Sequence, residues 1–178
     1  PPEAYSNRMK ETAATLCARA EQLMEDVPGK RQNATLYTYA RNFYNNSIQA
    51  GKDDEYYSQA SYCYTTNLRL RELALQNVSQ QILLENFHRL NKAHALFEKQ
   101  IDNQTLETFS DLETYVIVKE RLLETKNYMD RINQSNISST LLAYSIERYY
   151  SGVAWSGFFG MPGENLQLDD RSLHVAAV

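Results

Sequence analysis

The chain has 178 residues, of which 43% are hydrophobic, so it is long and apolar enough to bury the core of one domain. The 18 basic and 22 acidic residues give a formal net charge of -4. Lysine and arginine are nowhere dense enough to bind a row of phosphates, and no run of roughly 20 apolar residues could cross a membrane. We therefore expect neither nucleic acid nor a membrane as a direct partner of this chain.

Helical periodicity dominates the sequence, without strict apolar/polar alternation and without an Asn-Gly or Asp-Gly hairpin signal between apolar runs. It predicts an all-α fold, an antiparallel bundle of about five helices with one long helical hairpin. The bundle is expected over residues 1–159 and an irregular tail over residues 160–178. Because the chain starts with Pro1 and Pro2 rather than Met, we expect it to be a fragment of a larger protein.

The first helix is expected over residues 2–26 and is stopped by Pro28 and Gly29. Its apolar stripe consists of Met9, Ala13, Leu16, Ala20 and Leu23. The second helix is expected from about Asn33 to Gly51, with Gly51 as a left-handed terminator. Its stripe consists of Leu36, Ala40, Phe43 and Ile48. Both helices are therefore expected to be amphipathic.

The third helix is predicted to begin at a cap provided by Asp53 or Asp54 and to continue to Ile101. At 1.5 Å per residue it would be a rod of roughly 70 Å, with a gentle kink at most, near Asn77. Its apolar residues at helical spacing are Tyr57, Ala60, Tyr64, Leu68, Leu75, Ile82, Phe87, Leu90 and Leu96.

A fourth helix begins at Thr105 or Thr108 and is expected to lie antiparallel to the second half of the third. Its apolar residues are Phe109, Leu112, Val116, Leu123 and Ile132. Ser138 is predicted to cap a fifth helix, in which small residues permit close helix contact at Ser145, Gly152 and Ser156. The apolar residues of this helix are Leu142, Ile146, Tyr149, Val153 and Trp155.

Asn-X-Ser/Thr triplets are more frequent than the composition predicts. Chance predicts about two for 14 Asn residues, whereas six occur. They lie at Asn33, Asn45, Asn77, Asn103, Asn133 and Asn136. Either a polar, Asn-rich surface produces them by accident, or the protein is exposed at the cell surface and these residues carry glycans.

The two cysteines, Cys17 and Cys63, are too far apart in sequence for a CxxC metal or redox motif. They are either two buried small hydrophobic residues or one disulfide between the first and third helices. A disulfide would fit an extracytoplasmic protein.

Two patterns bear on protein binding. Asp54, Tyr57, Ala60 and Tyr64 follow a helix and a turn in a way that resembles half of a tetratricopeptide repeat, but only one such unit is found, so a single helical hairpin with the same packing is the preferred explanation. The sequence also contains 13 Tyr. Most of these rings are expected to fill helix seams, but some could line a groove between the second, third and fifth helices that holds a peptide or a neighbouring domain. The candidate groove residues are Tyr57, Tyr64, Tyr149 and Trp155.

No catalytic, cofactor or metal motif is visible. His88 and His94 lie six residues apart and so on different helix faces, and His174 lies in the tail. There is no GxSxG, no Gly-rich loop and no Cys/His pair in a suitable context. We therefore expect no enzymatic activity, cofactor or metal for this chain.

Several blocks together resemble the helical region that follows the protease domain of archaeal, membrane-anchored Lon-like serine proteases. They are the block 39–44, Gly51-Lys52-Asp53, the block 56–61, and Ala143 with Ile146-Glu147-Arg148 and Ala154-Trp155. The resemblance covers about two thirds of the chain and implies a parent with a Ser/Lys dyad in a preceding domain and a membrane anchor elsewhere. No residue here matches the motif of that dyad, so no catalytic residue is carried over.

The preferred hypothesis is a non-catalytic accessory or protein-interaction domain of a larger extracytoplasmic protein. Its partner would be a neighbouring domain or a second copy. The alternative is a stand-alone cell-surface scaffold or adaptor that binds a protein or peptide. An accessory domain should show an exposed apolar patch near its chain ends.

Overall fold

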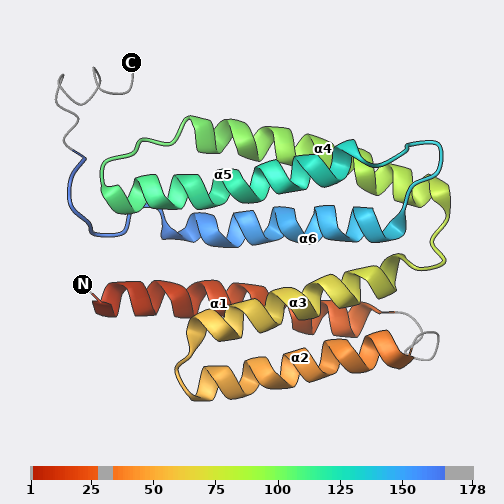
Figure 1. The fold of residues 1–178 in the computed structure, drawn as a ribbon, viewed down its shortest axis with the longest axis horizontal. Helices are drawn as coiled ribbons and strands as arrows, with labels where there is room; N and C mark the ends of the chain where they lie inside the picture. The colour runs from red at the N-terminus through yellow and green to blue at the C-terminus, as the bar shows by residue number, and fades with distance from the viewer. Residues whose placement is uncertain (1, 28–33, 167–178) are drawn as a thin grey trace.

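The computed structural model describes residues 2–27 and 34–166 (Figure 1). These residues form six α-helices and one short 3₁₀ helix. The elements are α1 (Pro2–Asp26), α2 (Ala34–Lys52), α3 (Tyr56–Leu75), α4 (Gln80–Asp102), α5 (Phe109–Asp130), α6 (Ser139–Trp155) and η1 (Ser156–Phe158). The all-α prediction is confirmed.

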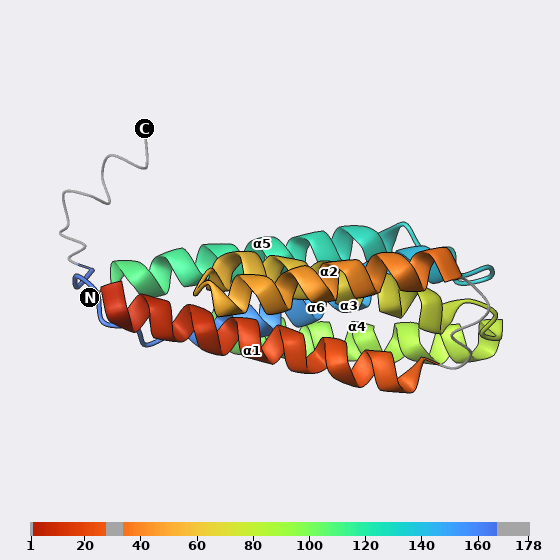
Figure 2. The ribbon, with the colours of Figure 1, turned by 90° about the horizontal axis from the view of Figure 1, so that it is seen from below.

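The helices form two layers of three, α1–α3 and α4–α6, and successive helices run in opposite directions (Figure 1). In the orthogonal view all six still follow one long axis (Figure 2). The layers meet where α6 packs against α3 and α1. Residues 2 and 166 lie at the same end of the bundle, beside the beginning of α5 (Figure 1).

The first helix agrees with its prediction, and its five stripe residues are buried. Pro28 and Gly29, its predicted stop, lie outside the described residues.

The prediction that Gly51 ends α2 in the left-handed conformation is wrong. Gly51 is still helical, and Asp54 takes the left-handed conformation, with φ of 59°. A Cβ at residue 51 would lie 2.5 Å from Nε2 of Gln59, so a larger residue there would displace the end of the Gln59 side chain. The predicted cap of the next helix is also wrong, because the N-cap is Glu55 and no side chain caps α3.

The prediction of one continuous third helix is also wrong, because the chain breaks between α3 and α4. Asn77 has φ of 60°, which an α-helix does not accommodate. Ser79 then caps α4 by accepting a hydrogen bond from the Ile82 N–H. The side chain of Gln80 holds this corner by bonding both the N–H and the C=O of Ile137. The break reverses the chain, so α4 lies in the other layer and pairs with α5 as expected.

Four of the five residues of the apolar stripe predicted for the fourth helix face water instead of the core, whereas the fifth, Ile132, is buried just beyond the end of α5. Phe109, Leu112, Val116 and Leu123 are 51%, 38%, 58% and 61% exposed. The inner face carries Val118, Leu122 and Met129 together with Thr114 and Thr125. Each of these Thr hydroxyls donates to the backbone oxygen four residues earlier, at 2.8 Å, so its polar group is satisfied inside the bundle. Other stripe residues that prove exposed are Ile48, Tyr57, Ile82 and Leu96.

The predicted caps of the last two helices are confirmed at Thr108 and Ser138. Asp111 completes a capping box on α5 and also accepts a hydrogen bond from the Gly160 N–H, at 2.9 Å. Residues 160–166 are irregular, as expected, but they run along the start of α5 and form a short antiparallel bridge between Thr108 and Asn165. The remaining tail, residues 167–178, lies outside the described residues. The close contact predicted for Gly152 is present, because an added Cβ there would lie 3.2 Å from Cβ of Arg121.

Candidate interaction surfaces

Cys17 of α1 and Cys63 of α3 form a disulfide, with their Cα atoms 5.0 Å apart. Of the two alternatives left open by the sequence, the structure has the bonded one. Cys63 is fully buried in a cluster formed by α1, α3, the end of α6 and η1. The bond therefore fixes the layer of helices against which α6 packs.

Five of the six predicted glycosylation sites lie in the described residues, and all five Asn residues are exposed. Asn103, Asn133 and Asn136 lie in connections between helices, Asn77 lies at the α3–α4 break, and Asn45 lies within α2. Asn33 lies outside the described residues. A glycan at any of the five described positions would project into solvent.

Three of the four predicted groove residues line one pocket, of about 300 Å³, between α3 and the α5–α6 pair. We call this the arginine pocket. Its wall residues are Leu16, Tyr57, Ala60, Ser61, Tyr64, Thr65, Arg121, Arg148, Ser151 and Trp155. Its position differs from the prediction, because the walls come from α1, α3, α5 and α6, without any described residue of α2.

Tyr149 does not belong to this pocket. Its ring packs edge-on against Phe97 of α4, with ring centroids 5.9 Å apart, and against Tyr150, at 5.3 Å. Burial raises the pKa of its hydroxyl, with a further contribution from Tyr150. Tyr149 therefore fills a helix seam, which is the other role that the sequence left open for its tyrosines.

Two guanidinium groups give the arginine pocket its character. Arg148 bonds Glu124 and lies 5.6 Å from the centre of the Tyr64 ring. Burial is the largest single influence on the pKa of Arg148 and lowers it, but Glu124 and Tyr64 together raise it above its ordinary value. Burial raises the pKa of the Tyr64 hydroxyl despite the nearby Arg148. At neutral pH the pocket therefore presents a cation and a neutral phenol.

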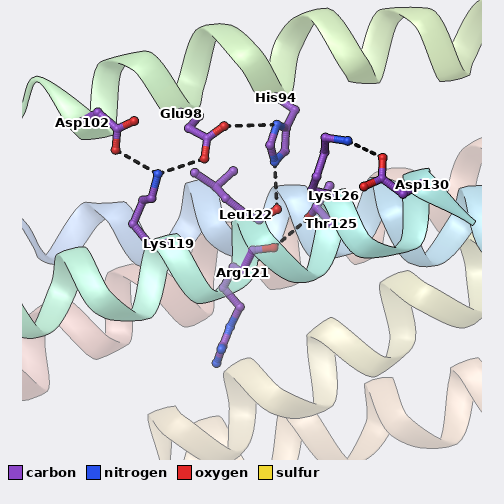
Figure 3. A network of polar contacts seen from close by, with 9 residues as sticks. All are labelled: His94, Glu98, Asp102, Lys119, Arg121, Leu122, Thr125, Lys126 and Asp130. Atoms are coloured by element: carbon purple, nitrogen blue, oxygen red, sulfur yellow. Dashed lines mark hydrogen bonds and ion pairs between the residues drawn. The ribbon is translucent and has the colours of Figure 1, made fainter.

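Arg121 extends from α5 on the side opposite α4 (Figure 3). Its Nη1 lies 2.9 Å from a carboxylate oxygen of Glu120, whose side chain is 58% exposed. Its Nε–H is buried and has no hydrogen-bond acceptor among the described residues. A buried donor without a partner costs on the order of 1–3 kcal/mol. This unsatisfied donor distinguishes Arg121 from the other arginines of residues 2–27 and 34–166.

A second surface is the exposed side of α5, which we call the α5 face and define by Phe109, Leu112, Val116 and Leu123. These residues recur every three, four or seven positions and so lie along one side of the helix. The face begins at the end of the bundle that also contains residues 2 and 166 (Figure 1). At the same end Tyr5 is 52% exposed and lines a small, mainly apolar pocket of about 90 Å³ with Phe158 and Met161.

Glu147 is a buried charge with a structural role. It is 1% exposed and accepts hydrogen bonds from Arg19, at 2.7 and 2.8 Å, and from Arg71, at 2.9 Å. Arg19 also lies over the ring of Tyr150, 3.5 Å from its centre. These contacts join α1, α3 and α6, and both cations are paired with the carboxylate.

A polar network joins α4 and α5 (Figure 3). The Lys119 ammonium lies 2.9 Å from both Glu98 and Asp102. Its hydrogen bond lowers the pKa of Asp102, against the opposing effect of burial. Buried His94 donates from Nε2 to the Leu122 carbonyl oxygen at 2.8 Å, because that oxygen can only accept. The charges pair with one another, so we assign this network to helix packing.

Within residues 2–27 and 34–166, no three His, Cys, Asp or Glu side chains are grouped so that they could hold a metal ion. His94 is occupied by Leu122, and His88 packs on Phe87. His174 lies outside the described residues. In the same part of the chain no helix has the length and hydropathy needed to cross a membrane.

Comparisons with protein-family models, with curated proteins and with solved structures find no match. The fold and the two surfaces therefore define the chain only as an all-α helical bundle with a disulfide, an exposed apolar helix face and a polar pocket that contains two arginines.

Sequence reasoning missed Arg121 and Arg148. A usable signal existed for Arg148, since Glu147 and Arg148 are the only charged residues of α6. A charge in an otherwise uncharged packing helix must find a partner, so such a pair marks a position where other helices converge. Arg121 offered no comparable signal, because α5 carries charges along most of its length.

Proposed function

We propose that the chain is a non-catalytic accessory domain of a larger extracytoplasmic protein and that it binds another domain of that protein through the α5 face. The α5 face is the observation that carries the proposal. Large apolar side chains occur singly on most protein surfaces, whereas a continuous exposed row marks an interaction site. Burying such a row against a partner releases water from apolar surface, which favours association.

The position of the α5 face supports a partner in the same protein. The face begins at the end of the bundle where the described chain both starts and finishes (Figure 1). A covalently joined neighbour would be held close to this end at high effective concentration, so a modest apolar contact suffices for docking.

Two observations support an extracytoplasmic location. Disulfides such as Cys17–Cys63 persist in oxidising compartments and are rare in a reducing cytosol. The five described Asn residues of the Asn-X-Ser/Thr triplets are all exposed, as glycan attachment requires.

The resemblance to the helical region of archaeal Lon-like serine proteases gives the proposed parent a specific form, in which the catalytic Ser/Lys dyad lies in a preceding domain and the anchor lies elsewhere. The likeness of the α2–α3 hairpin to a tetratricopeptide unit is part of the same proposal. It draws support from the antiparallel pairing of the two helices and from the burial of Ala60.

A stand-alone cell-surface adaptor is the second candidate. The arginine pocket favours it, because a polar pocket with aromatic rings on its walls can bind a ligand without any neighbouring domain.

The test uses the full-length parent protein with Val116→Glu and Leu123→Glu combined, beside a matched Leu96→Glu control. Leu96 is equally exposed, at 58%, but lies on α4. Both proteins should fold, as judged by circular dichroism. Only the double variant should lose protection of the domain junction in limited proteolysis, together with any casein hydrolysis that a serine-directed inhibitor blocks. A parent without a Ser/Lys domain, or unchanged protection in the double variant, would reject the accessory-domain proposal.

A further inference from the structure

We infer that the arginine pocket binds a carboxylate group carried by a peptide, with the carboxylate at Arg121 and Arg148 and the adjoining apolar side chain against Tyr57 and Trp155. The site is separate from the α5 face and does not depend on the proposed docking there.

The pocket has the size and composition of a ligand site. Its volume of about 300 Å³ is at the lower end of the range, roughly 300–1,000 Å³, that accommodates small ligands. The hydroxyl-bearing residues Ser61, Thr65 and Ser151 also line the pocket. This volume suits one side chain with a terminal carboxylate better than a folded protein surface.

The donor groups point to an anion. A guanidinium has five N–H donors, and each of these two is joined to a single glutamate, so further donors remain. The side chains of Arg121 and Arg148 are 20% and 19% exposed and both line the pocket, where a ligand oxygen would approach them.

The charge balance favours a carboxylate over a phosphate. Glu120 and Glu124 offset the charges of Arg121 and Arg148, so the group as a whole has little net positive charge. A dianionic phosphate would be repelled by both glutamates without enough cationic charge to compensate. A monoanionic, planar carboxylate matches the guanidinium fork and carries half that charge.

The aromatic rings indicate what accompanies the carboxylate. Tyr57 lines the pocket and is 65% exposed, although its side chain is a large ring. The centroid of this ring lies 6.2 Å from the ring centroid of Trp155. The two rings are tilted by 54° to each other, so they do not stack face to face. Exposed aromatic side chains beside an arginine are the residue types enriched at the centre of recognition sites.

Trp155 is the single tryptophan of the chain and lines both the arginine pocket and the small pocket beside Tyr5, so its fluorescence reports on a ligand in either, and the variants below distinguish the two. We would titrate the disulfide-bonded protein with Ac-Ala-Ala-Phe-OH, with the corresponding C-terminal amide, with Ac-Ala-Glu-Phe-NH₂ and with inorganic phosphate, and measure each Kd also by calorimetry. The first and third peptides distinguish a C-terminal carboxylate from an acidic side chain. At least one of them should bind about tenfold or more tightly than the uncharged amide, as a charge-assisted hydrogen bond implies.

Variants locate the binding. Arg121→Gln and Arg148→Gln should each weaken binding about tenfold or more, whereas the exposed Arg89→Gln on α4 should leave it unchanged. Tyr57→Ala removes an exposed ring without affecting the core and should also weaken binding, so the inference stays testable if an arginine variant fails to fold. Equal binding of the amide, tighter binding of phosphate, or unchanged binding by Tyr57→Ala would overturn it. Val116→Glu with Leu123→Glu should bind the peptide normally, which separates this result from the test of the docking face.

Discussion

The guanidinium of Arg19 donates two hydrogen bonds to the carboxylate of Glu147, although these residues lie 128 positions apart and Glu147 is 1% exposed. Burial alone, the largest influence, would lower the pKa of Arg19, but Glu147 raises it above its ordinary value. Arg19 therefore remains protonated inside the bundle, and its hydrogen bonds to Glu147 join α1 to α6.

Glu147→Gln should be strongly destabilising. It leaves Arg19 and Arg71 without a countercharge in a buried place, and breaking such a group costs about 3–5 kcal/mol. The free energy of unfolding from urea denaturation measures this. Glu11→Gln, which removes an exposed partner of Arg8, is the control and should cost less than about 1 kcal/mol. If Glu147→Gln lowers the free energy of unfolding no more than the control does, the buried contacts of Glu147 with Arg19 and Arg71 do not stabilise the fold.

Removing the disulfide should also lower stability. The bond closes a loop with a sequence separation of 46 residues, and replacing both Cys17 and Cys63 by Ala should cost about 2–4 kcal/mol, mainly because the unfolded chain becomes less restricted. Denaturation of the wild type with and without a reducing agent gives the same comparison. The reducing agent should have no effect on the double variant, and any effect there would show that it acts elsewhere.

Two neighbouring leucines test the orientation of α5. Leu122 is fully buried and Leu123 is 61% exposed. Leu122→Ala should therefore cost about 2–5 kcal/mol, whereas Leu123→Ala should change stability by less than about 1 kcal/mol. Chemical denaturation of both variants tests which side of α5 is buried: the observed inner face, which includes Leu122, or the apolar stripe predicted from the sequence, which includes Leu123. The reverse order of the two losses would mean that α5 is rotated.

Asp111 should make stability fall in acid. Burial, the largest influence, raises the pKa of its carboxyl group, but hydrogen bonds from Gly160, Glu107 and Thr108 together lower it below its ordinary value. A carboxyl group with a lowered pKa in the folded state contributes stability above its unfolded pKa of about 3.9, and this contribution is lost as the pH falls through the folded value.

The variant Asp111→Asn, which has no ionisable carboxyl group at this position, tests the contribution of Asp111 to stability. The variant should be less stable than the wild type at pH 7, and the difference should shrink below about pH 4 as the wild-type carboxylate is protonated. Urea denaturation across this range measures the difference. If it stays constant from pH 7 to acid, the ionised carboxylate does not hold residues 160–166 on the start of α5.

Local signals in the sequence determined the helical class and several helix ends. Thr108 and Ser138 were identifiable as caps because a side-chain oxygen that accepts from a nearby backbone N–H needs no distant partner. The inner stripe of α1 was equally readable, since its five apolar residues follow the helical repeat and meet no competing stripe.

Only the tertiary structure decided which side of α5 is buried, where Asn77 breaks the chain and how Arg19, Glu147, Arg121 and Arg148 are placed. Helix α5 has apolar residues on two sides, and its inner side includes threonines whose hydroxyls bond their own helix, so hydrophobic periodicity could not choose between them. The ionic contacts of Arg19 with Glu147 and of Arg148 with Glu124 join residues far apart in sequence, and their free energy depends on burial and geometry that exist only once the helices have packed.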